Sequence, residues 1–270
     1  MQGRSVSPCE SASGLDHVLE KLEWDSEYFG FPVACLTASD LDEAGVARSL
    51  EAAIDAGFRL ICWTTGADRM LPEPLLATYG GLLADRRAVF ELSDLSMIRQ
   101  MSSERSVSGW RIVEHERGPA SPRLVELAIS AGEDSRFNRD KMISRDKFEG
   151  LYEIWIQRST RGELADAVLV AESAEGKPIG LITIAMPDGS GKIGLVAVAE
   201  EARGRGVGSR LMESAHRWMA TRYAPRAWVI TQLRNQAACR LYSRMGYKLA
   251  ELANVYHFWP TSPKGGSDNP

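Results

Sequence analysis

The stretch Gly194-Leu-Val-Ala-Val-Ala-Glu-Glu-Ala-Arg-Gly-Arg-Gly-Val-Gly208 decides the fold. Its apolar part, Leu195 to Ala199, is short and partly β-branched, which favours a strand buried on both faces. After Gly208, apolar residues recur at helical spacing and charged residues occupy the opposite face. A glycine-rich turn that opens a helix gathers backbone N–H groups and partial positive charge. The stretch therefore predicts a strand, a turn and a helix that together bind an anion.

The kind of anion is narrowed by what the sequence lacks. A dinucleotide-binding fingerprint needs other glycine spacing and an acidic residue about twenty positions further on. That region reads Trp228-Val-Ile-Thr231 and contains no acid. A phosphate-binding P-loop needs Gly-Lys-Ser or Gly-Lys-Thr, which is missing from the sequence. A purely structural glycine turn is the alternative, but the flanking Arg203 and Arg205 favour an anion site.

Two motifs, in order, carry a family resemblance. The first, Arg203-Gly-Arg-Gly-Val-Gly208, resembles the pyrophosphate loop Arg/Gln-x-x-Gly-x-Gly/Ala of the GCN5-related N-acetyltransferases, the GNAT superfamily. The second, Asn235-Gln-Ala-Ala-Cys-Arg-Leu-Tyr-Ser-Arg-Met-Gly-Tyr247, resembles the Asn-x-x-Ala-x-x-x-Tyr-x-x-x-Gly-Phe/Tyr helix of that family. The resemblance implies an α/β (α+β) acetyltransferase fold with a central mixed sheet. It also implies acetyl-CoA as cosubstrate and transfer of its acetyl group to an amine.

The same resemblance implies roles for the motif residues. Val198 would offer its backbone N–H to the thioester oxygen, and Tyr242 would act as general acid toward the departing thiolate. Asn235 would hold the cofactor arm. The other residues expected to bind the cofactor are Val196, Ala197, Arg203, Gly204, Arg205, Gly206, Val207, Gly208 and Ser209.

The catalytic residues have alternative interpretations. Tyr242 lies seven positions after Asn235, two turns along the same helix face, yet a core tyrosine with a satisfied hydroxyl would show the same spacing. Cys239 shares the helix, but it has no basic partner in the sequence, so covalent catalysis is the weaker interpretation. Glu200 and Glu201 follow the strand as carboxylates of a loop. We therefore assign no general base.

Composition limits the classes of function. The 270 residues allow one large or two ordinary domains, and 44% hydrophobic residues suffice for a core. A net charge of −4 disfavours binding to nucleic acid or a membrane surface. Apolar runs stay well short of the roughly 20 residues that span a bilayer, and we see no signal peptide. Scattered cysteines and histidines predict reduced thiols in the cytoplasm and no metal site.

We expect two domains. We expect disordered ends at residues 1–15 and 261–270, and a linker at the Ser-rich residues 102–109. We expect a small α/β domain at residues 16–101 and the acetyltransferase domain at residues 110–260. Residues 22–33 predict an aromatic turn. The expected strands are 33–36, 60–64, 87–92, 110–114, 167–171, 179–185, 227–232 and 247–259, and the expected helices are 40–57, 74–79, 124–129, 148–158 and the one after Gly208.

Arg136 and Phe137 lie in a charged loop where the family builds its acceptor site. Arginines beside an aromatic residue suit a pyrophosphate-linked, base-bearing substrate, although a solvated charged loop has the same composition. The opening Leu22-Glu-Trp-Asp-Ser-Glu-Tyr-Phe-Gly30, the turn Ser135-Arg-Phe137 and the helix at 148–162 resemble the TDP-fucosamine acetyltransferases. That resemblance implies a dTDP-linked amino sugar as acceptor, in the synthesis of surface polysaccharides.

Some features leave the acceptor open. The chain departs from those enzymes in a longer N-terminus, in the composition of residues 135–147 and in its tail. A protein N-terminus, a polyamine or an antibiotic amine is the alternative acceptor. A non-catalytic acyl-CoA-binding module is the alternative from another class. A homodimer is compatible with the sequence.

Overall fold

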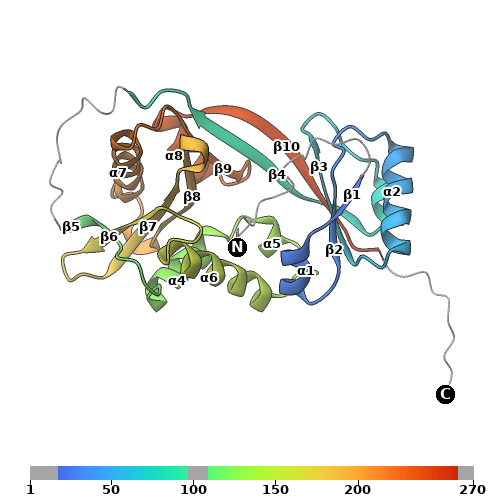
Figure 1. The fold of residues 1–270 in the computed structure, drawn as a ribbon, viewed down its shortest axis with the longest axis horizontal. Helices are drawn as coiled ribbons and strands as arrows, with labels where there is room; N and C mark the ends of the chain where they lie inside the picture. The colour runs from blue at the N-terminus through green and yellow to red at the C-terminus, as the bar shows by residue number, and fades with distance from the viewer. Residues whose placement is uncertain (1–17, 97–108, 261–270) are drawn as a thin grey trace, which may run out of the picture. The chain divides into compact units, whose positions relative to one another are not determined.

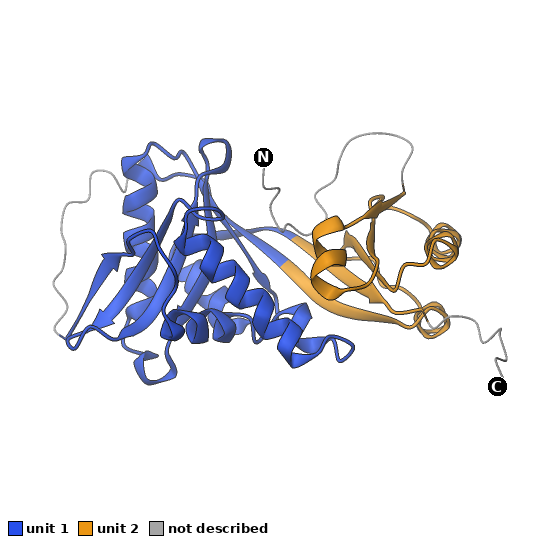
Figure 2. Cartoon of the chain, turned by 60° about the horizontal axis from the view of Figure 1, so that its bottom comes forward, with its two compact units in different colours: residues 1–3, 88–251 blue, residues 4–87, 252–270 orange. Residues whose placement is uncertain are grey.

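The computed structural model describes residues 18–96 and 109–260, whose elements are drawn in Figure 1. The chain forms two compact units, which are coloured separately in Figure 2. Unit 1 comprises residues 1–3 and 88–251, and unit 2 comprises residues 4–87 and 252–270. Two long strands, β4 (Gly81–Leu92) and β10 (Lys248–Phe258), contribute residues to both units.

Unit 2 is a sheet with the strand order β1-β2-β3-β10-β4 and one long helix on it. Its other elements are β1 (Leu19–Lys21), α1 (Glu23–Phe29), β2 (Val33–Leu36), α2 (Glu43–Asp55), β3 (Leu60–Gly66) and α3 (Glu73–Thr78). β2 and β3 are parallel, whereas β1–β2 and β3–β10 are antiparallel. The core forms where α2 packs on β3 and β10, around Trp63, Tyr256 and Phe258.

Helix α2 shows why these residues form this element. The Asp42 carboxylate accepts a hydrogen bond of 2.6 Å from the Gly45 N–H and so caps the first turn. The helix buries Val46 and Leu50, which are four positions apart and therefore share one face. Gly57 follows the helix end with φ of 82°, a conformation that glycine adopts readily. The sequence predicts a helix at 40–57, and the structure has it at Glu43–Asp55, between the Asp42 cap and Gly57.

Unit 1 has the strand order β4-β9-β8-β7-β6-β5. Its further elements are β5 (Trp110–Glu114), α4 (Pro122–Ala131), α5 (Arg136–Arg139), α6 (Arg145–Thr160), β6 (Ala167–Ser173), β7 (Pro178–Ala185), η2 (Pro187–Gly189), β8 (Gly191–Val198), η3 (Glu200–Ala202), α7 (Val207–Thr221), β9 (Ala227–Gln232) and α8 (Gln236–Arg244). β5 to β8 pair antiparallel, and β8 pairs parallel with β9. α4 and α6 lie on one face of this sheet and α7 on the other (Figure 1).

The close packing of α7 on β7 depends on Gly180. A Cβ at this position would lie 3.0 Å from the Ala197 carbonyl oxygen and 3.1 Å from side-chain atoms of Val207 and Leu211. These distances are shorter than ordinary carbon contacts, so a larger residue would push the helix away from the sheet. Gly180 thereby fixes where the first turn of α7 lies relative to β7 and β8.

The predicted α/β fold with a mixed sheet is confirmed, and β2, β5 and β9 have the predicted bounds. The segment predicted as an aromatic turn instead contains α1. Its Leu22 cap offers no side-chain hydrogen bond, but Trp24 and Tyr28, one helical turn apart, stack with ring centroids at 5.1 Å. This aromatic pair stabilises the helical turn, which has no side-chain cap. Within the described residues, no helix has the length and apolarity needed to cross a bilayer.

The compact units divide the chain differently from the predicted domains at 16–101 and 110–260. The end of β10 belongs to unit 2 because Ala253 to Phe258 pair with β3. The end of β4 belongs to unit 1. The linker predicted at 102–109, except Gly109, and the ends predicted at 1–15 and 261–270 lie outside the described residues.

One of the thiol predictions is wrong. Cys62 and Cys239 are free thiols, as expected, but Cys35 is disulfide-bonded. Sequence spacing alone does not reveal which cysteines meet in space.

A buried histidine–tyrosine pair joins α7 to Tyr247, the residue directly before β10. The His216 Nε2 atom lies 3.0 Å from the Tyr247 hydroxyl, and both side chains are buried. Burial lowers the pKa of His216 to about 4, with the nearby Arg217 charge acting in the same direction and Glu213 opposing it. His216 is therefore neutral in the folded protein at neutral pH.

This pair makes stability depend on pH. The unfolded chain binds a proton on His216 near pH 6.5, whereas the folded protein binds it only near pH 4, so stability is lost as pH falls through this window. Relative to a His216→Gln variant, the wild type should lose up to about 3 kcal/mol of unfolding free energy between pH 6.5 and 4. Urea unfolding at several pH values measures this, and equal slopes for the two proteins would contradict it.

Candidate active site

The central feature of unit 1 is a strand with one open edge. β8 pairs with β7 through Gly180↔Val198 and Ile182↔Val196. On its other side, β8 pairs with β9 only from Gly191 to Ile193. Within the described residues, the two parallel strands separate beyond that point. The part of β8 that contains Val196, Ala197 and Val198 is thus hydrogen-bonded to a neighbouring strand, β7, on one side.

The hydrogen bonds of β8 show which backbone groups face the open edge. The Leu195 N–H donates to the Thr183 Oγ1 at 2.8 Å, and the Ala199 N–H donates to the Ile179 carbonyl at 2.9 Å. Both acceptors belong to β7. Because N–H directions alternate along a strand, the N–H groups of Val196 and Val198 point the other way. They face the open edge, and an extended ligand could pair there as an added strand.

A glycine turn continues from this strand into α7. Gly204 and Gly206 have φ of 72° and 81°, and a Cβ at either position would meet nothing within 4 Å. Gly206 is the N-cap of α7 and supplies no side-chain cap. The first helical bond runs from the Arg210 N–H to the Gly206 carbonyl. The three preceding helical N–H groups, those of Val207, Gly208 and Ser209, therefore have no acceptor within the helix.

The electrostatics of this turn favour an anion. The N-terminus of a helix carries partial positive charge, and the three N–H groups without an acceptor in the helix point out of it. Arg203 and Arg205 are exposed beside the turn. The Arg203 Nε donates to the Val198 carbonyl at 3.2 Å, so this cation lies at the end of the open strand edge. The residues predicted to bind a diphosphate are thus contiguous with the strand predicted to bind the rest of the cofactor.

Helix α8 meets both of these elements at Gly208. A Cβ on Gly208 would lie 3.5 Å from Leu241 on α8 and 3.6 Å from Val198 on β8. Asn235 caps α8, because its Oδ1 accepts the Ala238 N–H at 3.0 Å. That bond uses the side-chain oxygen, and the amide nitrogen of Asn235 makes no bond with another described residue.

Tyr242 lies buried on α8 with an unused hydroxyl. Its side chain is 4% exposed and packs against Phe90 and Tyr247, at ring-centroid distances of 5.9 and 6.1 Å. Burial raises the pKa of Tyr242 well above its ordinary value, with a smaller contribution from Cys239. Its hydroxyl makes no hydrogen bond with a described residue, whereas the Tyr247 hydroxyl is bonded to His216. Tyr247, rather than Tyr242, fits the picture of a core tyrosine with a satisfied hydroxyl.

The structure gives Cys239 no basic partner among the described residues. Its sulfur lies 3.7 and 3.8 Å from the carbonyl oxygens of Gln232 and Leu233. Burial raises the pKa of this thiol, so the reactive thiolate is disfavoured. Residues 18–96 and 109–260 contain no group of three His, Cys, Asp or Glu side chains placed to hold a metal ion.

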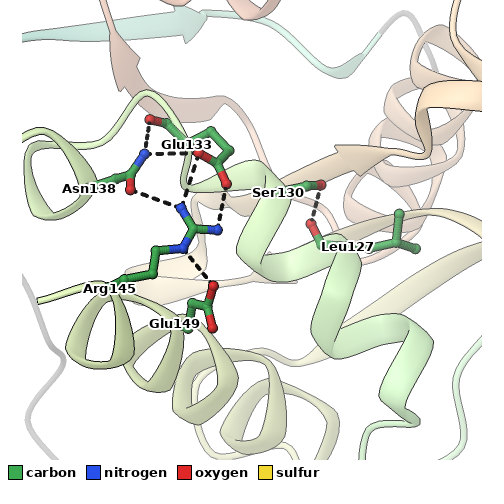
Figure 3. A network of polar contacts seen from close by, with 6 residues as sticks. All are labelled: Leu127, Ser130, Glu133, Asn138, Arg145 and Glu149. Carbon is green, nitrogen blue, oxygen red and sulfur yellow. Dashed lines mark hydrogen bonds and ion pairs between the residues drawn. The ribbon is translucent and has the colours of Figure 1, made fainter.

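Two of the arginines in and beside the loop predicted to bind the acceptor are engaged differently: Arg136 begins α5, and Arg145 begins α6. Figure 3 shows that Arg145 is fully engaged: it pairs with Glu133 at 3.0 Å and Glu149 at 2.6 Å, and it donates to the Asn138 amide oxygen at 3.0 Å. The hydrogen bonds to Glu133 and Glu149 raise the pKa of Arg145 further. Arg145 therefore ties the start of α6 to the α4–α5 connection.

Arg136 differs, because its guanidinium has no ion pair or hydrogen bond with a described residue. It lies over the Phe137 ring at 4.5 Å. Phe137 itself is 7% exposed and packs edge-on against Trp155. Phe137 is thus a core residue that supports Arg136, and its ring is not open for stacking with a ligand.

Thr183 belongs to no motif in the sequence, yet it contacts β8 in the structure. This side chain is 4% exposed and supplies the acceptor for Leu195 on β8. The signal was faint: it is the one hydroxyl residue in the otherwise apolar run from Ile179 to Ala185. Only the pairing of β7 with β8 reveals what it contacts.

The turn geometry generates a matched test. Gly206→Val should raise the Kd for acetyl-CoA at least about tenfold, because a β-branched residue is strained at φ of 81° and shields the helix N-terminus. Gly176→Val, at φ of 78° in the β6–β7 turn, imposes similar strain away from this site and should leave Kd unchanged. Calorimetric titration measures both, and equal Kd values for Gly206→Val and wild type would contradict the assignment.

Residues 136–247 match the model of the acetyltransferase (GNAT) family. Over 149 residues, the chain is 28% identical to the spore coat polysaccharide biosynthesis protein SpsD of Bacillus subtilis (strain 168). That match covers 54% of this chain, which spans about half (51%) of the relative's length.

Solved structures share the fold. A conserved protein of unknown function from Staphylococcus epidermidis is similar with a TM-score of 0.64 and 14% identity, over 94% of this chain and 96% of that one. A GCN5-related N-acetyltransferase from Sphaerobacter thermophilus has a TM-score of 0.57 and 15% identity, over 91% and 77%. A tandem GNAT protein from the clavulanic acid biosynthesis pathway has a TM-score of 0.54 and 14% identity, over 87% and 76%. At these identities the likeness concerns the fold alone.

The matched segment contains the open edge of β8, the glycine turn, α7 and α8. Through this segment, residues 136–247, the chain is similar to the acetyltransferase (GNAT) family.

Proposed function

We propose that the protein is an N-acetyltransferase that moves the acetyl group of acetyl-CoA to the amine of a nucleotide-linked amino sugar. One observation carries the proposal: the open edge of β8 runs directly into the uncapped, glycine-lined start of α7. A strand edge suits an extended amide-bearing arm, and the helix start suits a diphosphate. Acetyl-CoA contains both groups in one molecule, and family members use it as cosubstrate.

Each part of the site would bind one part of the cosubstrate. The diphosphate would accept hydrogen bonds from the backbone of residues 203–209, with Arg203 and Arg205 adding positive charge. The Val196 and Val198 N–H groups would bind the arm and the thioester oxygen. Asn235 has its amide nitrogen left for the same arm, because its oxygen caps α8.

The reaction needs three things from the protein. The amine nitrogen attacks the thioester carbonyl carbon, and the Val198 N–H would stabilise the oxygen that gains negative charge. The carbon–sulfur bond then breaks, and Tyr242 would supply a proton to the sulfur. Because burial keeps Tyr242 protonated, it would serve as a donor throughout the neutral range. The attacking amine gives up a proton, for which we assign no residue and expect a water relay.

The acceptor is inferred from the relative and from one arginine. The curated relative is named for polysaccharide biosynthesis, which agrees with a dTDP-linked amino sugar as acceptor. Arg136 is held on Phe137 and has no carboxylate partner among the described residues, so it could pair with a phosphate of such a substrate. Arg145 is already neutralised by two carboxylates and is not assigned to the acceptor. The cytoplasmic location and the homodimer remain predictions from the sequence.

The role of Tyr242 can be tested against its neighbour. Tyr242→Phe should lower kcat by about a hundredfold or more, because general acid catalysis contributes on that scale. It should leave the Kd for acetyl-CoA within about twofold, because the hydroxyl acts only as the sulfur departs. Tyr247→Phe is the control, since that hydroxyl is already bonded to His216. Steady-state rates measure this, and an unchanged kcat in Tyr242→Phe would remove it from the acid role.

The substrate class can be tested by release of free thiol. The purified protein with acetyl-CoA should release thiol with a dTDP-amino sugar and not with spermidine or a peptide N-terminus. Arg136→Gln should raise KM for the sugar about tenfold, and Arg145→Gln should leave it nearly unchanged. Turnover only with another amine would contradict the acceptor. Tight acetyl-CoA binding without turnover on any amine would instead indicate a non-catalytic binding module.

A further inference from the structure

The pairing of β7 with β8 contains a β-bulge at the point where β8 and β9 separate. Before it, Ile184 lies opposite Ile193, and after it, Ile182 lies opposite Val196. Gly194 and Leu195 therefore both oppose the single residue Thr183. The extra residue on β8 shifts the register by one position.

The shift decides which N–H groups face the open edge. The Ile184 carbonyl accepts from the Asp166 N–H on the β6 side, so Ile193, opposite Ile184, points its backbone groups away from β7. Without a bulge, strand alternation would continue this direction at Leu195 and Ala197. With the bulge, Val196 and Val198 face the open edge instead, and the Leu195 N–H turns toward β7.

The Thr183 side chain closes the bulge. Its Oγ1 accepts the Leu195 N–H at 2.8 Å, which gives that N–H an acceptor outside the regular backbone ladder. The fit is close: a Cβ on Gly194 would lie 2.5 Å from the same Oγ1. Glycine at 194 and a hydroxyl at 183 are therefore matched to each other. Leu195 is only partly buried, so the bond is local to the bulge.

We propose that Thr183 is a positioning residue for acetyl-CoA: its hydroxyl holds the Gly194–Leu195 bulge and thereby turns the Val196 and Val198 N–H groups to the open edge of β8. This inference rests on the proposed function, because it assigns those two N–H groups to the cosubstrate. Thr183 does not touch the cosubstrate and acts only through β8. A hydroxyl at this position is required, whereas the threonine methyl group is not.

The test uses two variants that differ in the hydroxyl. Thr183→Val keeps the shape and removes the acceptor, and it should raise the Kd for CoA at least about tenfold, because the Leu195 N–H loses its partner. Thr183→Ser keeps the acceptor and should stay within about threefold of the wild type. Calorimetric titration with CoA gives the values. Equal Kd values for Thr183→Val and wild type would overturn the proposal, and so would an equally large loss in both variants.

Hydrogen exchange on the wild type supplies a measurement that needs no variant. In the protein without ligand, the Leu195 amide should exchange slowly and the Val196 and Val198 amides rapidly. Addition of CoA should slow exchange at Val196 and Val198. The opposite pattern in the free protein would overturn the role of Thr183. If instead the free protein shows the expected pattern but CoA does not bind, the proposed function fails and the bulge assignment stands.

Discussion

The candidate site depends on one constraint: beyond Ile193, β8 pairs with a strand on one side only within residues 18–96 and 109–260. Backbone N–H groups need acceptors, so a half-paired strand inside a sheet is costly unless something else pairs with it. After η3 (Glu200–Ala202) and the glycine turn, the chain enters a helix whose first N–H groups have no acceptor within the helix. These two sets of donors would together make one elongated site for a ligand rich in acceptors.

Packing around the strand keeps that site open. Gly180 allows α7 to approach β7 closely, and Gly208 at the start of α7 lies between Val198 on β8 and Leu241 on α8. The helix that begins at the glycine turn and the helix with Tyr242 therefore both pack near the end of the same strand. Interiors packed at this density do not adjust freely, which suits a site whose groups must keep fixed positions relative to one another.

Charge has a different role in the acceptor loop. Arg145 lies in a network with Glu133, Asn138 and Glu149 that connects neighbouring elements (Figure 3). Arg136, nine positions earlier, is supported by an aromatic ring and keeps its hydrogen-bonding capacity. The same residue type thus stabilises the loop at one position and remains available to an anion at the other.

Much of this architecture could be predicted from the sequence. Strands such as 227–232 follow from runs of apolar residues, α2 follows from the Asp42 cap, and the glycine turn follows from its motif. Features set by contacts distant in sequence could not be predicted. The return of β10 to β3, the burial of Phe137 and the engagement of Arg145 by Glu133 all fall in this class. The β-bulge at Thr183 is another, because the register between two strands leaves little trace in either one.

The central claim is that acetyl-CoA binds along the open edge of β8 and across the glycine turn. A crystal structure of the protein with CoA tests it most directly. The account predicts the arm of CoA paired with Val196 and Val198, and its diphosphate on the N–H groups of residues 204–209. Density for CoA at any other surface, with this edge covered by protein, would contradict it.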